Sequence, residues 1–297
     1  MTRHDFEFSI NDAISQNRTT IKDIEDVEGW LTTQTYPKLT KEQIVAFLLS
    51  CHNDKSWAKN TIAANFALKS NRPDLFTDRT LRNVSIQKIL NVVHIGVMPV
   101  RLNGSVIVVS QMVDTDYHNF DLIAYTKFIL MGMETATLKA DPPDGLIAIL
   151  DSKGFGLMHL TCVKLDLVKW LLQYIQEGMP IKVTAVHIIN TNTASEMALN
   201  LAKPFIKNEI KKTVSADQNC VINMHIFVSD MFLQLHVHST SHMELFYQNH
   251  IPKRYLPSDI GGELEPLKTY REISLRNMDK MEEYFKFEEQ QRAAAAK

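Results

Sequence analysis

Through the first quarter of the chain, from Ile21 onward, apolar residues recur at intervals of three and four, and no strand pattern is present. This spacing is typical of amphipathic helices. The first predicted helix ends before Pro37, because the residue that precedes a proline avoids the helical conformation. Thr40 and Gln43 form a capping-box signature that opens a second helix. A third helix is predicted over 55–68.

From about Leu90 the pattern changes, and short runs of β-branched residues alternate with helical stretches. We predict strands at 105–110, 145–151 and 181–189, and helices at 120–138, 165–176 and 194–212. Nearly continuous apolar strands that alternate with helices indicate βαβ units and a largely parallel sheet. Residues 221–228 also have a strand-like composition, which is compatible with either an added edge strand or a disordered loop.

The expected fold is therefore of the α/β class. An N-terminal helical bundle precedes a domain with a mostly parallel sheet and flanking helices. We predict a helical subdomain, a junction, a sheet-containing domain and a helical tail, with boundaries at 1–75, 76–95, 96–265 and 266–297.

The charge balance gives no sign of a polyanionic partner. The 297 residues include 32 basic and 34 acidic side chains, for a formal net charge of −2, so nucleic-acid binding through phosphate neutralisation is not expected. With 45% hydrophobic and 22% charged residues, the composition excludes collagen-like, disordered and coiled-coil proteins. The chain is expected to be globular with a large core.

Three cysteines, Cys51, Cys162 and Cys220, are too few and too scattered for a disulfide framework, and they are expected to be reduced. The charged start of the chain lacks the apolar core of a signal peptide. No apolar run approaches the ~20 residues of a membrane span. We therefore expect a cytoplasmic protein.

Catalytic sequence motifs are missing. The chain contains no phosphate-binding loop, no Gly-x-Gly-x-x-Gly turn and no Gly-x-Ser-x-Gly nucleophile elbow. The two glycines of residues 153–156 follow a predicted strand, but without a third glycine they indicate a turn. We expect no enzymatic activity, no catalytic residue and no cofactor.

Histidines gather late in the chain. His236 and His238 are two residues apart, so on a strand both would face one side, and His242 follows closely. Three imidazoles can hold a metal ion. Glu244 is the one further candidate ligand at a recognisable spacing, and imidazoles on a solvated strand need no metal. The pattern therefore favours histidines without a metal.

The predicted helix at 194–212 is amphipathic. Small and large apolar residues line one side, and Glu196, Asn200, Lys203, Lys207 and Lys211 align on the other. Such a helix packs on a sheet as an ordinary surface helix, or it closes a lipid cavity while its lysines face a membrane. The periodicity does not separate the two.

Four stretches together resemble the CRAL-TRIO family of lipid-transfer proteins. They are DGLIAILDSKGF at 144–155, MPIKVTAVHIIN at 179–190, AKPFI at 202–206 and IPKRYLPSDIGG at 251–262. The Leu-Pro-x-x-x-Gly-Gly ending is the most specific element, and the N-terminal helices resemble the accessory module of the family. The resemblance implies a CRAL-TRIO domain at 96–265. It also implies a non-catalytic carrier that encloses one hydrophobic ligand beneath a mobile gate helix at 194–212.

The resemblance also places candidate ligand contacts on the sheet floor, the surrounding helices and the gate. Each of these residues can instead belong to the ordinary core. The candidates are Ile123, Thr126, Leu130, Met133, Leu146, Ala148, Leu150, Leu157, Leu171, Ile175, Met179, Val183, Val186, Ala194, Ala198, Leu201, Ala202 and Phe205.

Two departures from the family pattern are evident. In tocopherol-type members a basic cluster outside the gate binds phosphoinositide headgroups. Here Lys182 matches a basic position, but Thr184, Glu209 and Thr213 replace positive charges. Lys182, Lys207 and Lys211 are the candidate contacts for an anionic lipid headgroup. The second departure is an extra segment at 214–232.

The gate carries small residues where tocopherol-type members carry bulkier ones. Ala194, Ala198 and Ala202 recur at intervals of four, which favours a ligand bulkier or longer than tocopherol, although small residues also let a helix pack closer. We expect a monomer that binds and transfers a tocopherol, retinoid, carotenoid, sterol or phospholipid and contacts membranes transiently. The alternative is a lipid-sensing adaptor whose gate state is read by a protein partner.

Overall fold

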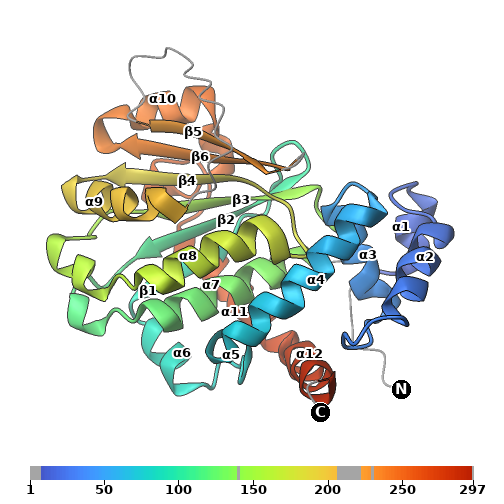
Figure 1. Cartoon of the computed structure of the whole chain (residues 1–297). Helices are drawn as coiled ribbons and strands as arrows, with labels where there is room; N and C mark the ends of the chain where they lie inside the picture. The colour runs from blue at the N-terminus through green and yellow to red at the C-terminus, as the bar shows by residue number, and fades with distance from the viewer. Residues whose placement is uncertain (1–7, 139–140, 206–221, 229–230, 296–297) are drawn as a thin grey trace.

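The computed structural model describes the backbone of residues 8–138, 141–205, 222–228 and 231–295 (Figure 1). The predicted N-terminal helices are confirmed as α2 (Ile21–Leu31), α3 (Lys41–Ser50) and α4 (Lys55–Asn71), with a further short helix α1 (Ile10–Ser15) before them. The capping box of α3 is formed as expected. The Thr40 hydroxyl accepts from the backbone N–H of Gln43, whose side chain accepts from the N–H of Thr40.

Two short helices, α5 (Pro73–Phe76) and α6 (Val84–Ile89), lead into a six-stranded sheet of order β1-β2-β3-β4-β6-β5. The strands are β1 (Val93–Val97), β2 (Ser105–Met112), β3 (Gly145–Asp151), β4 (Val183–Thr191), β5 (Ile222–Val228) and β6 (Met231–Ser239). The central strands β2, β3, β4 and β6 are parallel, while β1 and β5 pair antiparallel at the two edges. The α/β fold with a mostly parallel sheet is confirmed. Of the two possibilities for residues 221–228, the structure shows an edge strand, β5.

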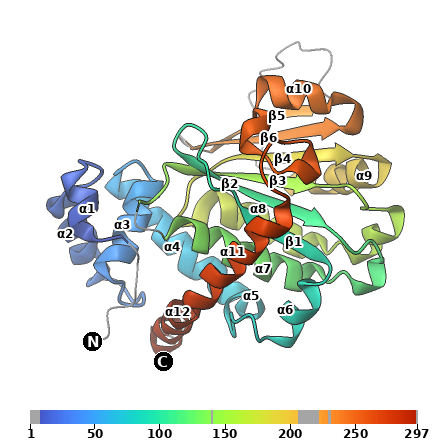
Figure 2. The same cartoon turned by 180° about the vertical axis from the view of Figure 1, so that it is seen from behind.

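Helices cover both faces of the sheet. On one face lie α7 (Leu122–Thr137) and α8 (Leu165–Gln173), while α9 (Thr193–Ala202) lies beside the end of β4 (Figure 1). The other face packs against α10 (Met243–Asn249) and the start of α11 (Leu267–Lys280), which crosses in front of β1 in Figure 2. The chain then continues into α12 (Glu282–Ala295).

Alternation along the strands sorts residues between two cores. Leu146 and Ala148 of β3 join a core that reaches through α7 to Ile62 and Phe66 of α4. Ile147 and Ile149, which alternate with them along β3, face the second core, under α10 and α11. The N-terminal helices therefore share one continuous core with the sheet, and the predicted subdomain boundaries stay a prediction.

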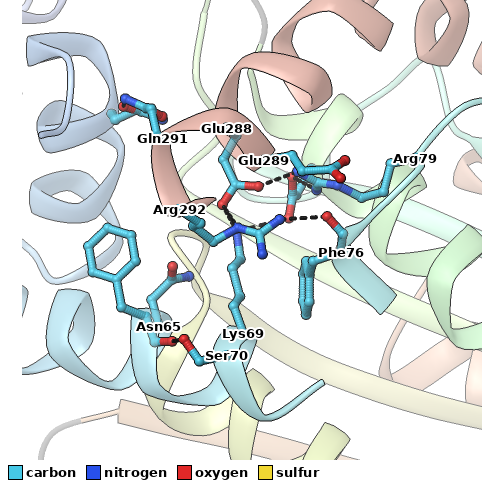
Figure 3. Close-up of polar contacts among 12 residues, drawn as sticks. Asn65, Lys69, Ser70, Phe76, Arg79, Glu288, Glu289, Gln291 and Arg292 are labelled. Carbon is cyan, nitrogen blue, oxygen red and sulfur yellow. Dashed lines mark hydrogen bonds and ion pairs between the residues drawn. The ribbon is translucent and has the colours of Figure 1, made fainter. Parts of the chain in front are cut away.

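A buried ionic network joins the C-terminal helix to the N-terminal half (Figure 3). Glu288 of α12 accepts hydrogen bonds from Lys69 of α4, at 3.0 Å, and from Arg79. Arg292, one turn further along α12, donates to the same carboxylate at 2.9 Å. Burial by itself raises the pKa of Glu288, but the three cations outweigh it and hold the pKa at about 2. The carboxylate is therefore ionised in the folded protein.

The Gly-Gly pair in the 251–262 segment has a steric cause. Gly261 ends a 3₁₀ turn with φ of +82°, a conformation that favours glycine. A Cβ on Gly262 would overlap the carbonyl group of Leu256. The Tyr247 hydroxyl donates to the Ile260 carbonyl at 2.6 Å and holds this turn against α10. The pair lets the chain fold tightly before α11 begins.

Candidate functional site

A cavity of about 240 Å³ lies at the carboxyl ends of the parallel strands, between the sheet and α7, α8 and α9. In open α/β sheets, ligands bind outside the carboxyl ends of the strands. The lining is Val93, Ser110, Met112, Phe120, Leu122, Tyr125, Leu150, Asp151, Ser152, Phe155, Val163, Val168, Ile188, Ser195, Ala198 and Leu199. Most of these side chains are apolar, so the cavity suits a ligand with a largely apolar surface.

Two helix starts shape the cavity walls. Asp121 caps α7 by accepting from the backbone N–H of Ile123 at 2.8 Å. Asn192 caps α9 in the same way, with its side-chain oxygen 2.9 Å from the N–H of Ala194. The Asn192 amide also donates to the carbonyl of Phe155 at 2.9 Å. This bond ties the first turn of α9 to the loop after β3, where Phe155 lines the cavity.

The polar groups of the lining differ in their role. The Ser110 and Tyr125 hydroxyls are 3.1 Å apart, and burial raises the pKa of Tyr125, so its phenol is neutral. Asp151 accepts from Gln111, at 3.1 Å, and from Asn190, at 2.9 Å. The carboxylate therefore holds the ends of β2, β3 and β4 together. The Ser110–Tyr125 pair is the polar group best placed to orient a ligand.

The structure brings only part of the predicted contact set to this cavity. Leu150 and Ala198 line it. Other candidates are buried in the core shared by the sheet, α7 and the N-terminal helices, or pack against it: Ile123, Leu130, Met133, Leu146, Ala148, Leu171, Ile175, Met179, Val183 and Val186.

The remaining candidates have varied surroundings. The Thr126 hydroxyl donates to the Leu122 carbonyl within α7. Ala194 is buried, and Ala202 and Phe205 are half-buried. Leu157 and Leu201 are exposed on the surface next to the cavity. The ligand-contact set as a whole stays a prediction.

Several lining residues were not expected from the sequence, among them Ser110, Met112, Phe120 and Phe155. The sequence does contain a signal for two of these lining residues. Ser110 and Met112 lie at the carboxyl end of a predicted parallel strand, where such folds place their ligands. Phe120 is the first residue of the helix predicted at 120–138, but α7 begins only at Leu122, and Phe155 lies in the loop after β3. These two residues reach the cavity only through tertiary packing.

Exposed apolar side chains lie close in sequence to several residues of the cavity lining. Leu157 is 60% exposed and Met158 51% exposed on the 3₁₀ helix Leu157–Cys162, while Met197 is 47% exposed on α9. Leu165 and Leu201 add two more exposed leucines at 40% and 45%. Helix α9 contacts both the 3₁₀ helix and α8, which carry the other three. We call these five residues the apolar rim.

The candidate basic contacts are only partly described. The Lys182 ammonium donates to His52 Nε2 at 2.7 Å, and burial lowers the pKa of Lys182. Lys207 and Lys211 lie outside the described residues, as do 206–221 of the segment around them. None of the helices in the described part of the chain is both long and apolar enough to cross a bilayer.

The late histidines lie on the face of the sheet opposite the cavity. His236 and His238 of β6 face one side, as their spacing predicts, and both are buried. His187 of β4 and His250, after α10, join them. Ring nitrogens of His187, His236 and His250 lie within 4.8 Å of one another. His242 instead pairs with the Ser239 hydroxyl at 2.7 Å.

Comparison with known proteins adds two findings. Residues 102–231 match the family model described as the CRAL/TRIO domain. A search of solved structures finds the crystal structure of Sfh5, which aligns with 90% of this chain and 82% of that chain at 10% sequence identity and a TM-score of 0.46.

Proposed function

We propose that this chain, whose residues 102–231 match the CRAL/TRIO domain model, binds one lipophilic molecule in the cavity beside α9 and transfers it between membranes. The observation that carries the proposal is the apolar cavity itself. It lies at the carboxyl ends of β2, β3 and β4, and all of its lining except Val93 belongs to the matched region. Its few polar groups include the Ser110–Tyr125 pair.

The physical basis is burial of apolar surface. Removing apolar area from water contributes roughly 25 cal/mol per Å², so an apolar cavity gives affinity without a reactive residue. The hydroxyls of Ser110 and Tyr125 then supply one hydrogen-bonding position for a hydroxyl, carbonyl or headgroup oxygen of the ligand. We expect the ligand to be mainly hydrocarbon with one polar end.

Helix α9 is the proposed gate. Ala198 and Leu199 line the cavity, while Met197 of the same helix belongs to the exposed apolar rim. A volume of about 240 Å³ is below the roughly 300–1,000 Å³ of most ligand pockets, so a sterol- or carotenoid-sized ligand requires α9 to move outward. The small Ala198 side chain supports the hypothesis of a bulky or long ligand.

The apolar rim is the proposed membrane contact. Five exposed apolar side chains at the cavity entrance lose contact with water when the entrance meets a bilayer. The ligand can then pass between the cavity and the hydrocarbon layer without crossing water. Lys182, Lys207 and Lys211 stay candidate contacts for anionic headgroups, at about 1 kcal/mol for each charge near such a surface.

The test is to identify the bound molecule and its transfer. Purified protein is extracted with organic solvent and analysed by mass spectrometry, and the enriched species is then followed between donor and acceptor vesicles. We expect one lipophilic species enriched to near one per chain, and transfer that depends on protein concentration. Bound lipid without transfer would favour the lipid-sensing alternative. No enriched lipid, and no saturable binding of added lipids, would refute both.

A further inference from the structure

Four imidazoles meet on the face of the sheet that the cavity does not use. His187 of β4 lies directly opposite His236 of the neighbouring parallel strand β6, and His238 follows two residues later on the same face. His250 returns over them from the end of α10. All pairs of ring centroids are 4.4–6.1 Å apart. The cluster is assembled from three separate segments.

Three ring nitrogens of this cluster lie near one another. One ring nitrogen each from His187, His236 and His250 lies within 4.8 Å of the others. In a tetrahedral zinc site with Zn–N distances of about 2.0–2.1 Å, two ligand nitrogens are about 3.3 Å apart. To form such a site the side chains must rotate, because the rings of His187 and His236 are stacked at 12° to each other. No other group of three ligand residues with this convergence occurs among the residues that the structure describes.

Hydrogen bonds around the cluster support metal ligation. His187 Nδ1 is 3.1 Å from His238 Nε2, and His236 Nε2 is 3.1 Å from the side-chain oxygen of Gln234. A ligating histidine usually gives its second ring N–H to such a partner, which fixes the tautomer and the ring orientation. When His187 donates its Nδ1–H to His238, it keeps the lone pair of Nε2 for a metal.

His187, His236 and His238 are buried, and neutral imidazole is the form that binds metals. Phe246 of α10 packs against His187 and His238. His250 is less buried than the other three rings and provides an access route from solvent.

We propose that His187, His236 and His250 bind a divalent transition-metal ion that prefers imidazole ligands, such as Zn²⁺, with His238 as the positioning partner of His187. Three histidines leave a fourth coordination position for water or another ligand. Imidazole also binds Cu²⁺, Ni²⁺ and Co²⁺, so the ion that occupies the site depends on which metal is available. The inference departs from the expectation of no metal and does not depend on the lipid cavity.

The experiment uses the full chain without a histidine tag, stripped with EDTA and titrated with Co²⁺ at pH 7.5. We expect one equivalent of Co²⁺ to give the visible d–d absorption of a four-coordinate site, and Zn²⁺ to displace it. His250→Gln and His187→Gln each remove one ligand and are expected to abolish the saturable signal. His238→Gln removes only the positioning partner and is expected to weaken binding by roughly 10–100-fold.

His118→Gln is the matched control, because His118 is 68% exposed and lies in the 3₁₀ turn Tyr117–Asn119, outside the cluster. It is expected to bind Co²⁺ as the wild type does. Far-UV circular dichroism of the metal-free variants establishes that each is folded, and His250→Gln, at the least buried position, is the variant expected to keep its fold. The proposal is overturned by a wild-type chain without saturable Co²⁺ binding, or by a folded His250→Gln variant that binds Co²⁺ with unchanged affinity.

Discussion

Arg79 Nη1 donates to Glu134 Oε2 at 2.8 Å, and the two side chains are only 1% and 4% exposed. The second carboxylate partner of Arg79 is Glu288, so one guanidinium joins α7 to α12. Burial alone lowers the pKa of Arg79, but the two carboxylates raise it above its ordinary value. The C-terminal helix is therefore held to the core by buried charges, each of which is compensated only by the others.

Removing one charge from this network should strongly destabilise the fold. Glu288→Gln leaves Lys69, Arg79 and Arg292 without their shared carboxylate, and breaking a buried ion pair from one side costs about 3–5 kcal/mol. We expect the free energy of unfolding in urea to fall by that amount. Glu283→Gln on the same helix is the control, because Glu283 is 77% exposed and such surface pairs contribute about 0–1 kcal/mol. Equal effects of the two substitutions would contradict the assignment.

Filling the cavity should displace the ligand. Ala198→Phe adds a ring to the cavity wall, so we expect the amount of co-purified lipid and the transfer rate to fall at least tenfold. Asn200→Phe places the same ring on an exposed position of α9 and should leave both near the wild-type level. Mass spectrometry of extracts and a vesicle transfer assay measure these quantities. Undiminished lipid in Ala198→Phe would show that the ligand binds elsewhere.

Charges on the apolar rim should weaken membrane binding. Burying a leucine or methionine side chain contributes about 1.5–3 kcal/mol, so the double variant Leu157→Asp, Met197→Asp should reduce cosedimentation with neutral vesicles by at least about tenfold. Ile273→Asp changes a similarly exposed apolar residue on α11 and serves as the control. If both variants bind vesicles alike, the rim is not the docking surface.

Because of the histidine cluster, we expect the free energy of unfolding to fall in mild acid. In the metal-free protein the pKa of His238 is lowered to about 4 by burial and then by His250 and His242, and the pKa of His187 to about 2. The unfolded chain has ordinary histidines with a pKa near 6.5 and takes up these protons first. Neither histidine lowers the free energy of unfolding above pH 6.5. Below pH 6.5 that free energy falls, down to about pH 4 for His238 and about pH 2 for His187.

The measurement is urea unfolding at pH 7, 6 and 5 in the presence of EDTA. Each of the two histidines should lower the free energy of unfolding by up to about 1.4 kcal/mol per pH unit below pH 6.5. The hydrogen-bonded and ionic partners of Glu282 and Glu288 lower the pKa of each to about 2. These two residues therefore lower the free energy of unfolding only below the ordinary pKa of 4.5, outside the pH range of the measurement. His238→Phe should flatten the profile, and a flat wild-type profile would contradict the prediction.

Sequence reasoning was most successful where the signal is local. The start of α3 at Thr40 and Gln43 depends on residues three apart, and the common face of Leu146 and Ala148 depends on residues two apart. Both follow from backbone geometry alone. The cavity was predicted less completely, because an apolar pattern indicates only that a side chain is shielded from water. It does not distinguish Leu146, packed on other side chains, from Leu150, which lines an open volume.

The sequence by itself determined the alternation of helices and strands, the mostly parallel sheet and the resemblance to a lipid-binding family. Only the tertiary structure decided which side chains meet. His187 and His238 are 51 positions apart, and Arg79 and Glu288 are 209 positions apart, yet each pair is in hydrogen-bond contact. Such contacts are set by how complete helices and strands pack together, and no periodicity within a single element encodes them.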